Sequence, residues 1–256
     1  MSRNGVEMRG MKIELVLGVV IVAMLGIGLW QQQQVIGALV ALRTSGGARA
    51  AAGNAPVINS PKAPSPLATV SLDFDLKGAA IRGQSTGDVV FLEFSDFQCP
   101  FCKRYIDEVY PRIAADYIDS GKIRYAFRHF PLESLHPNAM NSALAASCAQ
   151  RDGKFWQMHD RLFSNQQALD LPALLTYGAA VGANDARYRA CVTGKATLSQ
   201  VQADGDVALR SELTGTPGFF VGHVGADGKL HAVRRVIGSQ PYTVFQSAID
   251  DVLAKK

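Results

Sequence analysis

Residues 89–102 read VVFLEFSDFQCPFC, a nearly continuous apolar run that ends in two cysteines separated by two residues. Such a run predicts a buried β-strand, and after Cys99 the apolar positions recur at helical spacing as far as Gly121. Pro111 lies within that helix and predicts a kink. We therefore expect Cys99 and Cys102 at the start of a helix that directly follows a central strand.

Three kinds of chemistry suit two cysteines at this spacing. A structural zinc site needs four ligands, commonly as two short-spaced pairs, and the remaining cysteines stand alone at positions 148 and 191. A structural clip between residues three apart closes a tiny loop and stabilises the fold little. Metal ligation and a clip are the less favoured alternatives, and we predict no metal site.

Thiol–disulfide exchange has a physical reason at each cysteine. At a helix N-terminus Cys99 faces unpaired backbone N–H groups and the positive end of the helix dipole, which stabilise a thiolate. A thiol with a pKa of ~8.5 is only a few per cent ionised at pH 7, whereas one lowered to ~5 is almost wholly ionised. Cys102, one turn further along, is suited to attack Cys99 and resolve a mixed disulfide.

The flanking sequence indicates an α/β domain. Residues 70–76 alternate apolar and polar side chains as an edge strand does, and residues 123–130 read as another strand after the helix. Strand, helix and strand in this order imply a right-handed parallel crossover.

The second half of the domain changes pattern twice. Residues 136–212 show helical patterning interrupted by glycine and proline, which predicts three or four helices. Residues 219–223 and 231–238 flank the turn signal Ala226-Asp227-Gly228 and predict a β-hairpin, which adds antiparallel strands to the sheet. Residues 243–253 predict a closing amphipathic helix.

The N-terminal region has the pattern of a signal anchor. Residues 15–30 carry no charge and would span roughly 24 Å as a helix, against ~30 Å for the hydrocarbon core. Basic residues precede this run, which predicts residues 1–14 in the cytoplasm, a transmembrane and Gln-rich segment over 15–42, and an exported remainder. A small-x-small site at residues 48–50 leaves a cleaved, periplasmic or secreted form as the alternative.

Composition is consistent with one globular domain behind a linker. Residues 43–69 are rich in Gly, Ala, Ser and Pro, which predicts an extended linker. The chain of 256 residues is 48% hydrophobic, enough for a sizeable core, and its four cysteines suit an oxidising compartment. Its 26 basic and 22 acidic residues are scattered, so we expect no nucleic-acid partner.

Two motifs together resemble a known family. FLEFSDFQCPFC at residues 91–102 and GTPGFFVG at residues 215–222, with the helical block between them, resemble the DsbA-like branch of the thioredoxin superfamily. The resemblance covers about residues 70–254. It implies a thioredoxin fold, with a central mixed β-sheet flanked by helices, and an inserted helical domain at about residues 136–212. It also implies that Cys99 is an exposed nucleophile and Cys102 the resolving thiol.

The resemblance extends to residues around the cysteine pair. Thr216-Pro217 matches a cis-proline loop that offers backbone groups to an extended substrate, with an ordinary trans turn as the alternative. Glu93 matches a buried carboxylate that handles the proton of Cys102, unless it simply faces solvent.

Two further pairs of residues follow from the same resemblance. Pro100 and Phe101 form the dipeptide between the cysteines, and strongly oxidising members often carry histidine where Phe101 stands. Cys148 and Cys191 resemble a structural disulfide that would close a loop of about 44 residues and contribute roughly 4 kcal/mol. Free buried thiols are the alternative for this second pair.

Four other polar residues near these motifs have simpler interpretations. His159 shares a helical face with apolar residues and is predicted to pack rather than act as a base, and His136 is predicted to be a local structural residue. Lys103 and Arg104 are predicted to be solvated, with a contribution to thiolate stabilisation as the alternative.

We therefore expect a membrane-tethered, exported dithiol oxidase that accepts electrons from cysteine pairs of exported proteins and needs no cofactor beyond its redox-active disulfide. The resemblance implies reoxidation by a quinone-linked membrane partner. An anchored reductase or isomerase, fed by a membrane electron donor and including a role in cytochrome maturation, is one alternative. An exported binding or chaperone module with an incidental CxxC is another, and the sequence leaves the direction of electron flow open.

Overall fold

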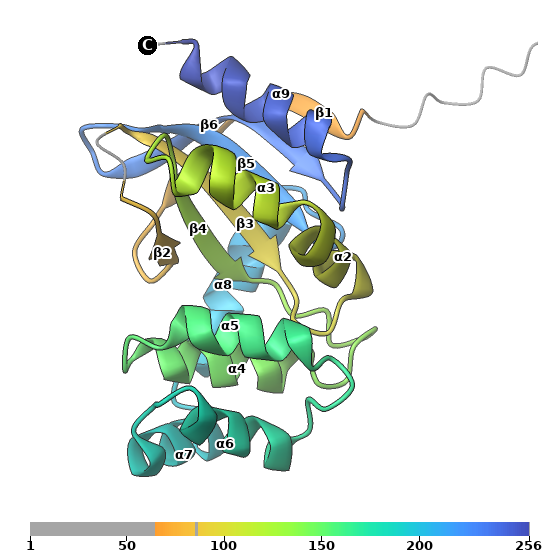
Figure 1. Cartoon of the computed structure of the whole chain (residues 1–256), viewed down its shortest axis with the longest axis vertical. Coiled ribbons are helices and arrows are strands. Elements are labelled where there is room, and N and C mark those ends of the chain that lie inside the picture. The colour runs from red at the N-terminus through yellow and green to blue at the C-terminus, as the bar shows by residue number, and fades with distance from the viewer. Residues whose placement is uncertain (1–64, 85–86, 256) are drawn as a thin grey trace, which may run out of the picture. The chain divides into compact units, whose positions relative to one another are not determined.

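One mixed sheet organises the computed structural model, which describes residues 65–84 and 87–255 (Figure 1). Both stretches belong to the second of the two units into which the chain divides, residues 63–256. The strand order is β1-β6-β5-β3-β4-β2, with β3 and β4 parallel and the other neighbours antiparallel. The strands are β1 (Leu67–Asp75), β2 (Ala80–Arg82), β3 (Val89–Ser95), β4 (Arg124–His129), β5 (Gly218–Val224) and β6 (Lys229–Ile237).

The predicted strands are present, with two corrections. The edge strand β1 begins at Leu67, three residues before the predicted start at Val70, so the last three residues of the predicted linker belong to the sheet. The short strand β2 was not predicted, because three residues are too few to show an alternating pattern. The central strand β3 is buried along its whole length, as its apolar run predicts.

The segment between β3 and β4 is helical and broken near its proline. It comprises α2 (Pro100–Glu108), α3 (Tyr110–Ile113) and a π-helical turn, η1 (Ala114–Ile118). The break falls at Val109, two residues before Pro111, which cannot donate a backbone hydrogen bond. The kink and the parallel β–α–β connection are both confirmed.

Five helices, rather than three or four, separate β4 from β5: α4 (Ala139–Gln150), α5 (Phe155–Ser164), α6 (Leu171–Ala180), α7 (Asp185–Thr193) and α8 (Leu198–Arg210). Two of these helices, α6 and α7, begin at residues whose side chains cap the helix. Asp170 accepts a hydrogen bond from the N–H of Ala173, and Asn184 accepts one from the N–H of Arg187. These caps satisfy N–H groups that a helix start leaves unpaired.

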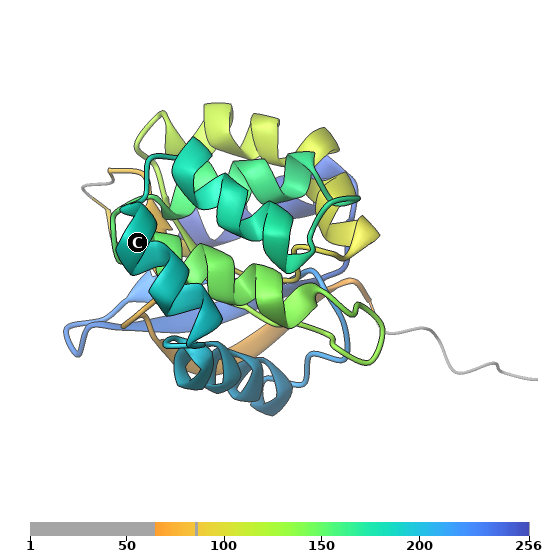
Figure 2. The same cartoon turned by 90° about the horizontal axis from the view of Figure 1, so that it is seen from below.

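The sheet carries helices on both faces because its buried strands are apolar on both sides. Phe91 and Phe219 point into a core with α2, α3 and the C-terminal helix α9 (Tyr242–Leu253). Leu92 and Phe220, one position along each strand, point into the opposite core with α8. Helices α4–α7 form a separate group beyond α2 and β4, at the lower end of Figure 1, and Figure 2 shows them from below.

The predicted hairpin and closing helix are confirmed. Strands β5 and β6 pair antiparallel, and their turn is closed by a hydrogen bond of 3.0 Å from the N–H of Gly228 to the carbonyl of Gly225. Gly228 has φ of 76°, in the left-handed region that glycine adopts without strain.

The predicted cytoplasmic segment, anchor and most of the linker, at residues 1–64, lie outside the described residues. Within residues 65–84 and 87–255, no helix combines the length and apolar character needed to cross a bilayer.

Candidate active site

Cys99 occupies the N-cap position of α2. Its backbone is extended (φ −70°, ψ 124°), Pro100 is the first helical residue, and the carbonyl of Cys99 accepts the N–H of Lys103 at 3.1 Å. Proline suits this position because a first-turn N–H would have no partner within the helix. The cysteine pair therefore begins a helix that follows β3, as its sequence predicts.

The sulfur of Cys99 lies against a loop from the other half of the domain. Its Sγ is 3.4 Å from the carbonyl oxygen of Thr216, and the Thr216–Pro217 peptide bond is cis. Cys99 is only 3% exposed, so the expectation of an exposed nucleophile is wrong for this structure. The cause is tertiary, since the loop at Thr216 and the helical block pack around the residue.

Neighbouring donors lower the pKa of Cys99 to about 6. The largest contribution is a hydrogen bond from the Cys102 thiol, and the Thr216 side chain and the N–H groups of Cys102 and Phe101 add to it. Burial acts in the opposite direction. The helix start thus stabilises a thiolate at Cys99, mainly through the second cysteine.

Cys102 has the opposite environment. It is completely buried, and burial, the Cys99 sulfur and Glu93 together raise the pKa of Cys102 well above its ordinary value. Both cysteines are free thiols in this structure. A dithiol in which one sulfur ionises readily and the other holds its proton is suited to stepwise exchange.

Glu93 lies completely buried on β3, as predicted. Burial raises the pKa of Glu93 to about 7, against the lowering effects of the Tyr125 hydrogen bond and of the nearby Ser95 hydroxyl. The Ser95 hydroxyl also lowers the pKa of Cys102, so Ser95 lies beside both groups. A carboxyl group that titrates near neutral pH next to a thiol can exchange protons with it.

Sequence reasoning missed the hydroxyls that surround Glu93. The Tyr125 hydroxyl donates to Glu93 Oε2, and the Tyr125 and Tyr105 hydroxyl oxygens are 3.4 Å apart. Glu93 and Tyr125 lie on the same face of the neighbouring parallel strands β3 and β4, since Glu93 pairs with Phe127, two residues beyond Tyr125. Strand pairing was therefore the signal that could have found Tyr125.

The turn that precedes Cys99 is anchored to the segment after β4. Asp96 Oδ2 accepts the N–H of Leu132 at 2.9 Å and lies 2.8 Å from His136 Nδ1, while Gln98 Oε1 accepts the N–H of Asn138 at 2.6 Å. His136 is thus a structural partner of Asp96, in agreement with its prediction. These contacts help to hold the cysteine-bearing turn in place.

The basic residues Lys103 and Arg104, which follow the cysteine pair, bind side chains other than Cys99. Lys103 Nζ pairs with Asp107 at 2.7 Å, and Arg104 donates to Ser239 Oγ at 3.2 Å. Phe101 is 54% exposed, with the Arg104 guanidinium 5.2 Å from its ring centroid. Phe101 and Pro100 are therefore the exposed residues of the CxxC stretch, whereas both cysteines are buried.

His159 packs rather than serving as an accessible base. It is fully buried, and its ring lies 4.9 Å from Phe163 and 5.4 Å from Phe127 between centroids. Burial lowers the pKa of His159. Within residues 65–84 and 87–255, no three His, Cys, Asp or Glu side chains gather as metal ligands.

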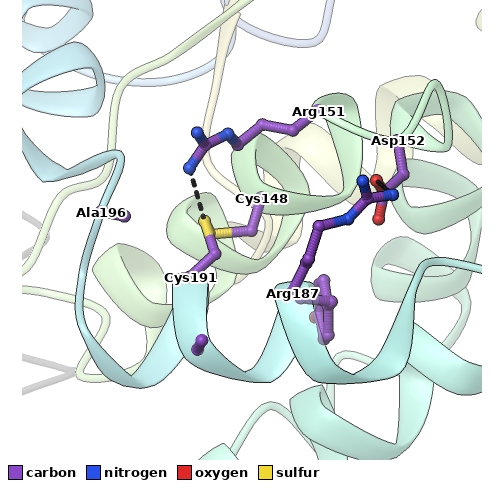
Figure 3. A pocket seen from close by; sticks show the side chains of 8 residues that line it. Cys148, Arg151, Asp152, Arg187, Cys191 and Ala196 are labelled. Carbon is purple, nitrogen blue, oxygen red and sulfur yellow. Dashed lines mark hydrogen bonds and ion pairs between the residues drawn. A yellow bond between two sulfur atoms is a disulfide. The ribbon is translucent and has the colours of Figure 1, made fainter.

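The second cysteine pair forms a disulfide, as the resemblance implies. Cys148 of α4 and Cys191 of α7 are bridged and line a surface pocket of about 470 Å³ (Figure 3). Arg151 points toward the bridge and donates to Cys191 Sγ at 3.8 Å. The bridge joins two helices of the block and lies outside the Cys99 site.

A family model described as Thioredoxin matches residues 76–251, well over half of the chain. Among solved structures, the chain is similar to oxidised BdbD from Bacillus subtilis (TM-score 0.62, 22% identity, 73% of this chain and 99% of that chain). It is also similar to alpha-DsbA1 from Wolbachia pipientis (TM-score 0.60, 22% identity, 69% and 92%). At these identities the likeness shows the fold, a DsbA-type thioredoxin fold.

Curated relatives match over a shorter stretch. A Salinispora tropica protein named Na(+)/H(+) antiporter NhaA 3 is 34% identical over 141 residues, which are 55% of this chain and 21% of that protein. Na(+)/H(+) antiporter NhaA 1 from Mycolicibacterium vanbaalenii is 34% identical over 157 residues, 59% and 24% respectively. The chain therefore spans about a quarter or less of the length of these relatives.

Proposed function

Because this chain belongs to the thioredoxin family, we propose that it is a protein thiol-disulfide oxidoreductase that oxidises cysteine pairs of exported proteins. The observation that carries this proposal is the contrast within the pair: Cys99 has a lowered pKa of about 6, and the pKa of Cys102 is raised. The proposal rests on this site rather than on the antiporter names, since those matches cover 21% and 24% of the named proteins.

Oxidation of a substrate proceeds in two exchange steps. A substrate thiolate attacks Cys99 Sγ of the oxidised pair, so a substrate–Cys99 disulfide forms and the Cys99–Cys102 bond breaks. Cys102 leaves with the electron pair and takes up a proton, which the buried Glu93 carboxyl group supplies. The second substrate thiolate then attacks its partner sulfur and releases Cys99 as a thiolate, leaving the substrate oxidised and the enzyme reduced by two electrons.

The lowered pKa of Cys99 favours the oxidising direction. A stabilised thiolate is a good leaving group and stabilises the reduced form of the pair, which makes its disulfide a stronger oxidant. The two cysteines supply the redox chemistry themselves, so the reaction needs no further cofactor.

We further propose that the domain is tethered to the inner membrane by residues 15–42, faces the periplasm and is reoxidised by a quinone-linked membrane partner. The uncharged run with its basic flank supports this localisation. Protease treatment of spheroplasts should digest the domain if it is exported, and protection would contradict the proposal. Intact-mass measurement distinguishes the anchored from the cleaved form.

Oxidative refolding of a reduced substrate protein tests the activity. We expect Cys99→Ser to abolish refolding and Cys102→Ser to accumulate a mixed disulfide with the substrate. Full activity of Cys99→Ser would show that the CxxC is incidental, as in a binding or chaperone module. A reduction potential of about −120 mV supports an oxidase, whereas one of about −270 mV would show the reductase or isomerase alternative to be correct.

A further inference from the structure

Gln166 connects the helical block directly to the cysteine-bearing turn. It lies in the loop between α5 and α6, and its Nε2 donates to the carbonyl of Phe97 at 2.7 Å and to the carbonyl of Cys99 at 3.1 Å. A carboxamide nitrogen has two N–H groups, so one side chain can satisfy both carbonyls. Neither the CxxC motif nor the other motifs pointed to this residue.

The loop that presents Gln166 is itself held in place. Asn165 Nδ2 donates to the carbonyl of Arg161 at 2.7 Å, and the Tyr177 hydroxyl donates to the carbonyl of Ala168 at 2.9 Å. Leu169 is buried against the helical block. The loop therefore offers the Gln166 carboxamide from a defined position rather than from a mobile tip.

The two carbonyls that Gln166 contacts belong to the turn that sets the position of the Cys99 sulfur. The Cys99 carbonyl also accepts the N–H of Lys103, the first such hydrogen bond of α2, so it fixes how the residue enters the helix. Carbonyl oxygens carry partial negative charge, and those beside a thiolate disfavour it unless donors offset them. Gln166 supplies such a donor from the loop between α5 and α6, which belongs to the helical block and not to the sheet or to α2.

We propose that Gln166 is a positioning residue: its carboxamide, presented by the helical block, holds the turn at Phe97–Cys99 so that the Cys99 sulfur faces the first N–H groups of α2. The block then does more than cover the site, because it contributes to thiolate stability at Cys99. The consequence of this role for catalysis rests on the proposed function. The contacts of Gln166 with the turn, and its effect on the Cys99 thiol, do not depend on the direction of electron flow.

Two substitutions and two matched controls test this role. Gln166→Met keeps the length of the side chain and removes its donors, while Gln166→Glu replaces the donor by a carboxylate that repels both carbonyls. The adjacent Gln167 is exposed, so Gln167→Met and Gln167→Glu make the same chemical changes one residue away. All four are made with Cys102→Ser, whose hydroxyl can still donate to Cys99.

The readout is the pH midpoint of thiolate absorbance near 240 nm. We expect Gln166→Met to move the Cys99 midpoint to higher pH by roughly half a unit, and Gln166→Glu to move it further. The Gln167 variants should leave it unchanged. The proposal would be overturned if the Cys99 midpoint were the same in the Gln166 and Gln167 variants. This holds even if thermal melting shows that the Gln166 variants are destabilised. A purely structural role of Gln166 would lower the melting temperature and leave the Cys99 midpoint unchanged.

This experiment separates the inference from the proposed function. If Cys99→Ser retains full refolding activity but Gln166→Met shifts the midpoint, the positioning role stands and the catalytic proposal fails. If Cys99 is essential and the midpoint does not respond to Gln166, the positioning role fails alone.

Discussion

The Tyr125 hydroxyl donates a hydrogen bond to Oε2 of Glu93 in the buried layer between β3, β4 and α2. This hydrogen bond lowers the pKa of Glu93 against burial, which raises it to about 7. The carboxyl group therefore titrates near the pH at which thiol exchange takes place, and its protonation depends on a residue 32 positions away in the sequence. A tyrosine on a neighbouring strand thus helps to set the proton chemistry at Cys102.

Tyr125→Phe removes that donor. We expect the pKa of Glu93 to rise above about 7, by roughly half a unit or more, because the ionised carboxylate loses a hydrogen bond. Carbon-detected NMR of labelled glutamate side chains measures the midpoint. Tyr117→Phe is the control, since that hydroxyl donates to Asp250 at 2.8 Å. An unchanged or lowered Glu93 midpoint in Tyr125→Phe contradicts the assignment.

Glu93→Gln should stabilise the fold at alkaline pH. The pKa of Glu93 is about 7 in the folded state and about 4.5 when unfolded, so the unfolded chain binds fewer protons between these values and native stability falls as pH rises through them. Above pH 7 the free energy of unfolding lost in this way approaches roughly 3 kcal/mol. Glutamine does not ionise, so the variant avoids this loss.

Urea unfolding at pH 5 and pH 8 checks this expectation, with the exposed Glu133→Gln as control. The stability advantage of Glu93→Gln should be larger at pH 8. Equal advantages at the two pH values would exclude a raised pKa at Glu93. The oxidative-refolding rate of the same variant should fall, because Cys102 loses its proton partner.

Alkylation of Cys99 in the reduced protein should follow its thiolate. We expect the rate to rise with pH around a midpoint near 6, below the ~8.5 of an ordinary thiol. Cys102→Ala should move the midpoint upward, because the Cys102 thiol is the largest cause of the lowered pKa. Mass spectrometry of iodoacetamide adducts gives the rates. A wild-type midpoint above pH 8 would show that Cys99 is not activated.

Phe101→His should make the pair more oxidising. Residue 101 is exposed and its backbone N–H already contributes to the lowered pKa of Cys99, so an imidazolium here adds positive charge beside the thiolate. Each tenfold gain in the exchange equilibrium corresponds to about 30 mV. Equilibration with glutathione measures the potential, with Phe101→Leu as control. If the reduction potential of Phe101→His were lower than that of the wild type, while that of Phe101→Leu were unchanged, the expected effect of a positive charge at position 101 would be contradicted.

Replacing Cys148 and Cys191 by alanine should lower the free energy of unfolding by about 4 kcal/mol, because the bridge closes a loop with a sequence separation of 43. The measurement uses a Cys99→Ser/Cys102→Ser background, in which no other thiol responds to redox conditions. Reductant should destabilise the parent of that background and leave the alanine variant unchanged. Equal stability of parent and variant under oxidising conditions would show that the bridge contributes little.

Local sequence determined the elements that carry the reaction. The apolar run of β3, the helical spacing after Cys99 and the turn at Gly228 are signals within a few residues of one another, so the order of strands and helices and the position of the cysteine pair were predictable. The pattern did not reveal β2, which spans three residues, or the number of helices in the block, whose boundaries depend on caps such as Asp170.

The chemistry of the pair was decided by tertiary structure. Thr216 lies 117 residues from Cys99 in the sequence, and Gln166 lies 67 residues from it, yet both contact it in the fold. The same packing buries Cys99 and surrounds Glu93 with hydroxyl groups. Periodicity reports short-range propensity and burial, whereas a pKa depends on which distant donors and apolar side chains packing brings together. The sequence by itself therefore placed the cysteines at a helix start, and only the folded chain decided how each of them ionises.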